Sequence, residues 1–200
     1  MNRTQKAWNE KKVAGTLFMD VKSAFNNVSK IHLEKRMEAL GIEADLIRWT
    51  MSLMTDQNLR IELDGETGEA LAVDTGVLQG SPAAPILFIV YLSGIFDEVE
   101  RKVAGFSGLS FVDDIRWWAD GKDDEVGAAK LSEAATASMV WAAQNGVAFD
   151  HGKTEAAIFW RKRKAAEAKA TVKVGGNEVP FNKEATWWLR VWLYSQLTLK

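Results

Sequence analysis

The pair Asp113-Asp114 constrains the fold most, because short apolar stretches at 109–112 and 115–119 flank it with no other residue between them. A gap of two residues is the spacing of a tight β-hairpin, so we predict two antiparallel strands joined at this pair. Neighbouring side chains on a regular strand point to opposite faces of a sheet. Two adjacent carboxylates therefore address one site only at a turn, which is where we place them.

Further segments complete a predicted core around this hairpin. They are a strand over 13–19 that ends at Asp20, a long helix from about 81 to 102, another from Asp123 or Asp124 to about 146, and strand segments at 147–150 and 154–160 around a turn. This order predicts an α+β fold, a split βαβ (ferredoxin-like) antiparallel sheet with helices packed on one face. The first strand then lies beside the hairpin, so Asp20, Asp113 and Asp114 meet.

Two amphipathic helices and a second hairpin are predicted between 29 and 73. Ser29 is a suitable N-cap for the first helix and Gly41 a suitable end. The expected buried faces carry Leu33, Met37 and Leu40 in the first helix and Leu46, Trp49 and Leu53 in the second. Stretches 60–63 and 70–73 flank Asp64-Gly65, a pair typical of a hairpin turn.

Composition excludes several classes of protein. The 200 residues are 47% hydrophobic and carry a formal net charge of -2, which predicts one globular domain without a basic field over the whole chain. Nucleic-acid contact then needs a local patch such as Arg161–Lys164, for which a localisation signal and a solvated loop are the alternatives. The absence of cysteine excludes disulfides and a zinc ribbon. No targeting segment is evident in 1–12, and 83–96 is too short to span a membrane.

Three carboxylates in one place favour a magnesium site. Asp20, Asp113 and Asp114 offer hard oxygen ligands, and Mg²⁺ binds through one or two carboxylates plus substrate phosphates. Two such ions support phosphoryl transfer, with Mn²⁺ as a possible substitute. The common alternative is a solvated Asp-Asp turn with no ligand.

Five blocks of sequence resemble, in the same order, the catalytic blocks of reverse transcriptases. They are Asp20–Asn26, Gly76–Pro82 followed by Pro85, Phe111–Asp114, Gly146–Glu155 and Trp188–Leu193. The third is the aromatic-x-Asp-Asp turn of that family. The first and fourth blocks, with Ala24-Phe25-Asn26 and Lys153-Thr154-Glu155, are most similar to non-LTR retrotransposon enzymes. The resemblance implies a polymerase palm.

The resemblance also implies roles for individual residues. Asp20 and Asp113 would hold two Mg²⁺ ions with Asp114 as the third carboxylate, and Lys153 would protonate the leaving pyrophosphate. For Lys153 the alternative is an ordinary surface lysine.

Three further residues would contact the incoming nucleotide. Phe25 would lie under its sugar and reject a 2′-hydroxyl, Gln79 would contact the nucleotide, and Gly80 would let the backbone approach it. For Phe25 the alternative is an ordinary core phenylalanine. For Gln79 and Gly80 the alternative is a loop that only leads into a helix.

The resemblance implies RNA template, DNA primer and deoxynucleoside triphosphates as partners, and no membrane. It divides the chain into a polar remnant of a fingers region (1–12), the palm (13–160), a basic loop (161–170) and C-terminal strands that lead toward a thumb (171–200). We expect a fragment of a polyprotein whose fingers, thumb and endonuclease lie elsewhere. We also expect an intracellular protein, in a nuclear or cytoplasmic ribonucleoprotein.

Some residues depart from the family pattern. Asn26 stands in place of an aspartate, and Arg190 and Tyr194 stand in place of glycine and aspartate. Two alternatives to a polymerase therefore stay open: a non-catalytic retrotransposon remnant, and a nucleic-acid-binding sheet module similar to an RNA-recognition motif. Exposed sheet aromatics would favour the latter. In Trp117-Trp118 and Trp187-Trp188, strand alternation predicts that one ring of each pair is buried.

Overall fold

The computed structural model describes residues 3–73, 75–78, 80–160, 168–182, 185–188 and 191–194. The chain divides into two compact units. One, which we call the sheet unit, contains residues 1–22, 95–143 and 148–200, and the other, the helical unit, contains residues 23–94 and 144–147. Arg161–Lys164, Arg190 and Gln79 lie outside the described residues.

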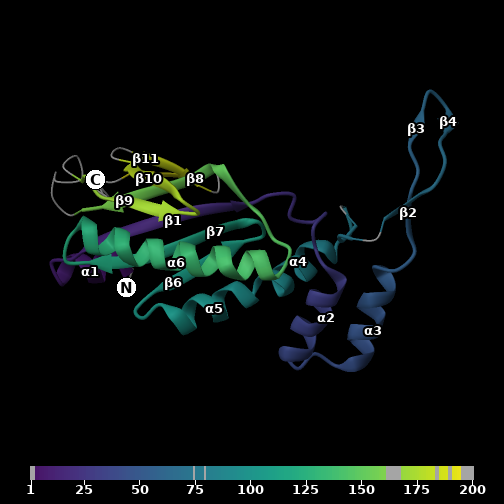
Figure 1. Ribbon diagram of the computed structural model, residues 1–200, viewed down its shortest axis with the longest axis horizontal. Coiled ribbons are helices and arrows are strands. Elements are labelled where there is room, and N and C mark those ends of the chain that lie inside the picture. The colour runs from purple at the N-terminus through teal and green to yellow at the C-terminus, as the bar shows by residue number, and fades with distance from the viewer. Residues whose placement is uncertain are drawn as a thin grey trace. The chain divides into compact units, whose positions relative to one another are not determined.

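The sheet unit contains a six-stranded sheet of order β6-β7-β1-β8-β10-β9 (Figure 1). Its strands are β1 (Val13–Val21), β6 (Ser107–Phe111), β7 (Asp114–Gly121), β8 (Phe149–Phe159), β9 (Thr171–Val174) and β10 (Asn177–Asn182). β1 pairs antiparallel with β7 and β8, which confirms its predicted place beside the hairpin. β10 runs parallel to β8, so the sheet is mixed at that side. The strands β11 (Ala185–Trp188) and β12 (Val191–Tyr194) form a separate antiparallel pair.

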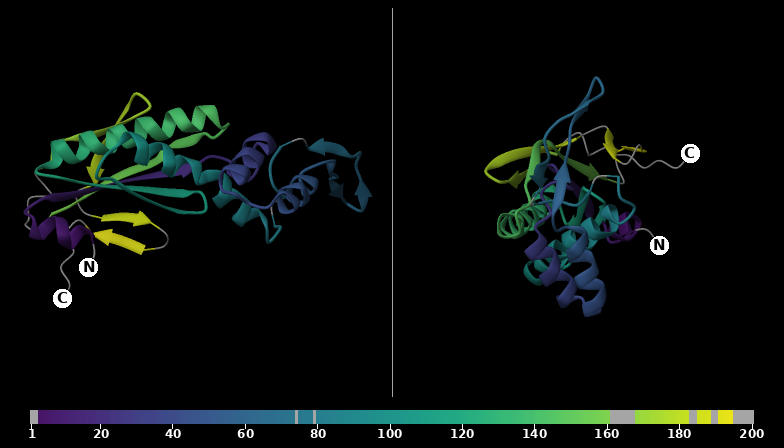
Figure 2. Two further views of the ribbon diagram at one scale, coloured as in Figure 1. Left: turned by 90° about the horizontal axis from the view of Figure 1, so that it is seen from below. Right: turned by 90° about the vertical axis from the view of Figure 1, so that its right-hand side faces the viewer.

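Both faces of this sheet are covered, as the left view of Figure 2 shows. The helices α5 (Gly94–Lys102) and α6 (Asp124–Gln144) lie on one face, where the rings of Phe96 and Trp117 are 5.2 Å apart. On the other face, α1 (Arg3–Asn9) packs against a cluster that contains Phe18 and Trp118. Helices on one face only were predicted, and α1 departs from that. Because both faces are covered, Trp117 and Trp118 are both buried, whereas alternation predicted one.

The helical unit begins with α2 (Lys30–Ala39) and α3 (Ala44–Leu53). The predicted caps of α2 are confirmed: Ser29 Oγ accepts the backbone N–H of His32 at 3.4 Å, and Gly41 ends the helix with a φ of 71°. The predicted face of α3 is wrong. Its buried residues are Ile47, Thr50 and Met51, whereas Leu46, Trp49, Leu53 and, at the end of α2, Leu40 are exposed. α3 has apolar residues on more than one side, and only packing selects the buried one.

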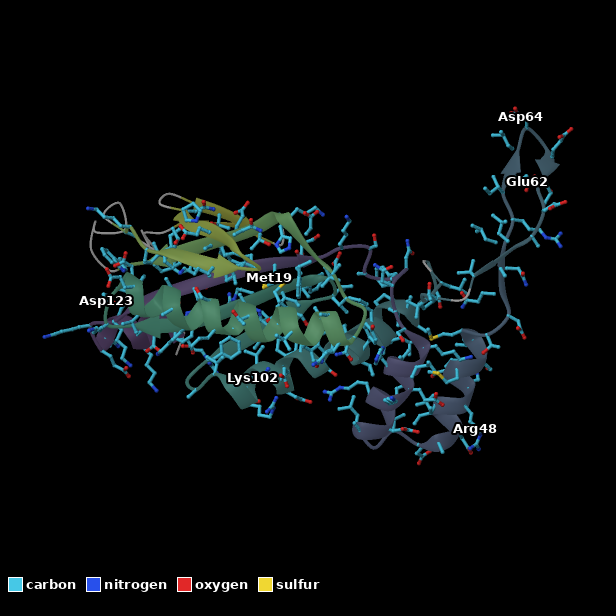
Figure 3. All side chains as sticks on the ribbon, viewed as in Figure 1. Met19, Arg48, Glu62, Asp64, Lys102 and Asp123 are labelled. Atoms are coloured by element: carbon cyan, nitrogen blue, oxygen red, sulfur yellow. The ribbon has the colours of Figure 1, made fainter. Side chains whose placement is uncertain are left out.

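A projecting hairpin follows α3 in the helical unit. β2 (Gln57–Leu59) pairs with β5 (Leu71–Val73), and β3 (Glu62–Leu63) pairs with β4 (Glu66–Thr67). Asp64 and Gly65 make the turn with φ values of 53° and 84°, which confirms that prediction. The hairpin extends away from α2 and α3 (Figure 1), and Figure 3 shows Glu62 and Asp64 at its tip.

The long helix predicted over 81–102 is two helices, α4 (Ala84–Leu92) and α5. Ser93 lies at the break, where its hydroxyl donates to the carbonyl of Val90 and accepts from Arg36 Nε at 2.7 Å. The second predicted long helix is confirmed as α6, and Asp123 Oδ1 caps it by accepting the N–H of Val126 at 2.9 Å. Within the described residues, every helix is too short or too polar to span a lipid bilayer.

Candidate active site

The turn between β6 and β7 presents the aspartate pair. Phe111 and Asp114 are the last paired residues, so Val112 and Asp113 form the turn, one residue earlier than predicted. Val112 has a φ of 54°. A β-branched residue in this left-handed region costs about 1–3 kcal/mol, so the surrounding hairpin has to impose this conformation. Asp113 thus lies in the turn, and Asp114 is the first residue of β7.

Asp20 lies directly opposite Asp114 on the neighbouring strand. Opposed residues of an antiparallel pair carry their side chains on the same face of the sheet. The backbone N–H of Val21 also donates to the carbonyl of Asp113 at 3.0 Å, which ties the end of β1 to the turn. The three predicted carboxylates are therefore neighbours, although Asp20 lies within β1 and not after its end.

The charge on this group is incompletely neutralised. Partial burial raises the pKa of Asp114, the negative charges of Asp113 and Asp20 raise it further, and the positive charge of Lys153 opposes them. Repulsion of this kind is typical of carboxylates that bind a cation.

Lys153 reaches the carboxylates through an irregularity in β8. Phe18 pairs with Glu155 and Asp20 pairs with Asp150, so two steps along β1 correspond to five along β8. A turn was predicted at 151–153, whereas the structure has a bulge within one continuous strand. Bulges redirect side chains near active sites. Here Lys153 Nζ lies 3.0 Å from Asp20 Oδ2, and the hydrogen bond and charge of Asp20 raise the pKa of Lys153.

Asp150 was missed by the sequence analysis. It lies opposite Asp20 on the β8 side, so Asp114, Asp20 and Asp150 form a row across three adjacent strands. Asp150 Oδ1 accepts the backbone N–H of Gly152 at 2.9 Å, and the charge of Asp150 also raises the pKa of Lys153. Only the register between β1 and β8 reveals this neighbour, and no local pattern in the sequence signals it.

The donor set suits a divalent metal by its chemistry. Among the side chains that the structure describes, no three or more from His, Asp and Glu are grouped closely enough to hold a metal ion. Mg²⁺ does not require such a cage, because it binds through one or two carboxylates and takes its other ligands from water and phosphates. Asp20 with Asp113 or Asp114 provides those carboxylates, and burial together with the charges of Asp113 and Asp20 raises the pKa of Asp114.

Of the predicted nucleotide-binding residues, Phe25 and Gly80 belong to the helical unit. The ring of Phe25 packs at 5.6 Å from that of Phe88, and its carbonyl accepts the N–H of Val77 at 2.8 Å. Gly80 has a φ of 96°, and a Cβ at this position would have no atom within 4 Å. Gly80 is thus open to close approach. Of the seven predicted residues, the sheet unit brings together Asp20, Asp113, Asp114 and Lys153.

Residues 1–182 match the family model described as "Reverse transcriptase (RNA-dependent DNA polymerase)". The chain belongs to the reverse transcriptase family. A stretch of 112 residues is 29% identical to the retrovirus-related Pol polyprotein from type-1 retrotransposable element R2 of Popillia japonica. That match covers 52% of this reverse transcriptase chain and 18% of the polyprotein. It confirms the predicted resemblance to non-LTR retrotransposon enzymes.

Solved structures of telomerase share the fold of this reverse transcriptase. Apo telomerase from Candida tropicalis superposes with a TM-score of 0.63 at 13% identity, over 89% of this chain and 32% of the telomerase chain. Telomerase from the same species in complex with a TWJ fragment of telomeric RNA gives a TM-score of 0.61 at 14% identity, over 89% and 31% of the two chains. The predicted α+β palm fold is confirmed.

Proposed function

We propose that this chain is the catalytic core of an RNA-directed DNA polymerase that adds deoxynucleotides to a primer 3′-hydroxyl. The observation that carries the proposal is the pairing of Asp20 on β1 with Asp114 on β7, beside Asp113 in the turn. A reverse transcriptase needs carboxylates in this arrangement for phosphoryl transfer.

Asp20 and Asp113 would hold two Mg²⁺ ions, or Mn²⁺, with Asp114 as the third carboxylate. Bound there, the ions would activate the attacking hydroxyl and stabilise charge on the attacking and leaving oxygens. The 3′-hydroxyl would lose its proton to solvent water, and its oxygen would bond to the α-phosphorus of the nucleotide as the bond to pyrophosphate breaks.

Lys153 would give a proton to that pyrophosphate. A lysine ammonium is protonated at neutral pH, so a proton is available, and the bulge in β8 places Nζ beside the carboxylates. An ordinary surface lysine would not need to lie beside these carboxylates.

The nucleotide-binding residues proposed from the resemblance are Phe25, Gln79 and Gly80. The packing of Phe25 against Phe88 fixes a flat ring, which suits a group that rejects a 2′-hydroxyl. RNA template, DNA primer and deoxynucleoside triphosphates are the proposed partners. The matched polyprotein is much longer than this chain, so we propose that fingers, thumb and endonuclease segments accompany it in an intracellular ribonucleoprotein.

Primer extension tests the proposal. The 200-residue chain is incubated with an RNA template, a labelled DNA primer, deoxynucleotides and Mg²⁺. We expect extension that Asp20→Asn and Asp113→Asn each reduce by about a thousandfold or more, since each removes a metal ligand. Asp120→Asn is the matched control, because Asp120 also lies on β7 and should leave extension near the wild-type rate. Extension that persists in both Asp20→Asn and Asp113→Asn would contradict the proposal.

One observation favours a second function, RNA binding without catalysis. Leu109 and Phe111 are exposed on the edge strand β6, and exposed sheet aromatics stack on bases in RNA-binding sheets. The carboxylates beside Phe111 oppose this function, because they repel phosphate in the absence of metal. The two functions differ in the same assay: RNA binding that Phe111→Ala weakens, without any extension, would support the second.

A further inference from the structure

We infer that Lys153 is the counter-ion of Asp20 in the metal-free protein and has to leave that carboxylate before a divalent metal binds there. The inference rests on the proposed function, because that function makes Asp20 a metal ligand. It adds a mode of regulation, because Lys153, the proposed proton donor, also competes with the metal for the Asp20 carboxylate.

The contact is direct. Lys153 Nζ lies 3.0 Å from Asp20 Oδ2, while the Asp20 side chain is only 19% exposed. Mg²⁺ approaches a carboxylate oxygen to about 2.0–2.1 Å. An ammonium ion and a dication on one partly buried carboxylate would repel each other strongly, so the two occupy Asp20 in turn.

The order of strands determines from which side Lys153 reaches Asp20. β1 lies between β7 and β8, and Lys153 comes from β8 whereas Asp114 lies on β7. Lys153 therefore contacts Asp20 from the strand on the other side of β1 from Asp114.

Asp150 provides a second carboxylate with which Lys153 can pair after it leaves Asp20. Asp150 lies opposite Asp20 and on the same strand as Lys153, and its negative charge raises the pKa of Lys153. Asp150 would keep the displaced ammonium next to the site, ready to meet pyrophosphate. Asp150 thus acts as a positioning residue for Lys153.

Manganese titration followed by electron paramagnetic resonance tests the competition without any measurement of activity. Mn²⁺ binding is compared for the wild-type chain, Lys153→Gln, Lys153→Arg and Lys173→Gln at low ionic strength. Lys173 is an exposed lysine on β9, separated from β1 by two strands, so its substitution makes the same change in net charge away from Asp20. We expect Lys153→Gln to bind Mn²⁺ about two- to fivefold more tightly than the wild type, the range for an exposed ion pair. Lys153→Arg and Lys173→Gln should bind like the wild type.

The outcomes separate the inference from the proposed function. Equal affinity in all four proteins, or tightening as large in Lys173→Gln as in Lys153→Gln, would overturn the competition while leaving the metal site intact. Affinity that Asp20→Asn does not change, in the wild type and in Lys153→Gln alike, would instead show that Asp20 is not a metal ligand. The proposed function would then fail and the inference with it. Binding detected only in Lys153→Gln would support the competition in its strongest form.

Discussion

Asp114 and Asp120 lie on the same face of β7, and their surroundings move their pKa values in opposite directions. Burial and the charges of Asp113 and Asp20 raise the pKa of Asp114. Burial alone would raise the pKa of Asp120, but the hydrogen bond from Lys12 and the charges of Lys12 and Lys130 outweigh it and lower the pKa. The first carboxylate therefore destabilises the metal-free fold at neutral pH, and the second stabilises it.

Replacing each aspartate by asparagine should change stability with opposite signs in metal-free buffer. At pH 7, Asp114→Asn should leave the free energy of unfolding equal or higher, and Asp120→Asn should lower it by about 0.5–1 kcal/mol. An acid with a raised pKa favours the fold below its ordinary value of 3.8 and disfavours it as pH rises through the raised value. An acid with a lowered pKa stabilises above 3.8 and loses this effect as pH falls.

Urea denaturation at pH 7 and pH 3 measures both effects. The advantage of Asp114→Asn should shrink at pH 3, where Asp114 is protonated in both states. The deficit of Asp120→Asn should also shrink as pH falls through the lowered pKa of Asp120. A loss of stability in Asp114→Asn at pH 7 would mean that Asp114 accepts structural hydrogen bonds, contrary to its proposed role in the site.

Phe25 should control the choice between ribonucleotides and deoxynucleotides. In an extension-competent protein, Phe25→Val removes the flat ring, so we expect ribonucleotide incorporation to rise by about tenfold or more with deoxynucleotide use preserved. Single-nucleotide extension with the two substrates measures the ratio. Circular dichroism serves as the control for folding, because Phe25 also packs on Phe88. An unchanged ratio in a folded variant would leave Phe25 with a packing role only.

At the scale of elements, Gly76 connects the segment 25–28 with the segment 76–77 within the helical unit. Its N–H donates to the carbonyl of Val28 at 3.1 Å, and the N–H of Val77 donates to the carbonyl of Phe25 at 2.8 Å. Gly76 has a φ of 92°, and a Cβ there would lie 2.9 Å from the carbonyl oxygens of Phe25 and Asn26. Both the conformation and the space therefore require glycine.

Gly76→Ala should destabilise the protein by more than Gly80→Ala. Both glycines have similar φ values, 92° and 96°, so both variants carry the strain of about 1–3 kcal/mol for a side chain in this region. Only at Gly76 does the new methyl group meet backbone. Thermal melts of the two variants isolate the effect of that contact. Equal melting temperatures would show that the backbone at Gly76 can move away from Phe25 and Asn26 at little energetic cost.

At the scale of the whole molecule, stability should be concentrated in the centre of the sheet. β1 pairs on both sides and is buried at most positions, whereas the strands of the 57–73 hairpin are almost entirely exposed. We expect amide hydrogens of β1 to exchange about a thousandfold or more slowly than those of the hairpin, as measured by mass spectrometry. Comparable protection in the hairpin would indicate that another surface covers it in solution.

Local features of the fold were predictable from the sequence because each depends on interactions within a few residues. Ser29 caps the helix that follows it, Asp64-Gly65 makes a hairpin turn, and Asp123 begins α6. The pairing of β1 beside the hairpin, which places Asp20 opposite Asp114, was also predictable, since the order of strands and helices restricts where β1 can pair. The turn nevertheless lies one residue earlier than predicted. The surrounding hairpin imposes the left-handed backbone conformation of Val112, which the residue would not adopt by its own preference.

Contacts between distant segments were decided only by the tertiary structure. Lys153 and Asp20 are 133 positions apart in sequence, and their ion pair depends on a bulge that exists only once β8 pairs with β1. Asp150 became a neighbour of Asp20 through the same register. The buried side of α3 was likewise selected by packing, since its apolar residues offered more than one face. A sequence specifies which side chains are available, but which of them share an environment depends on strand register and packing, which only the folded chain determines.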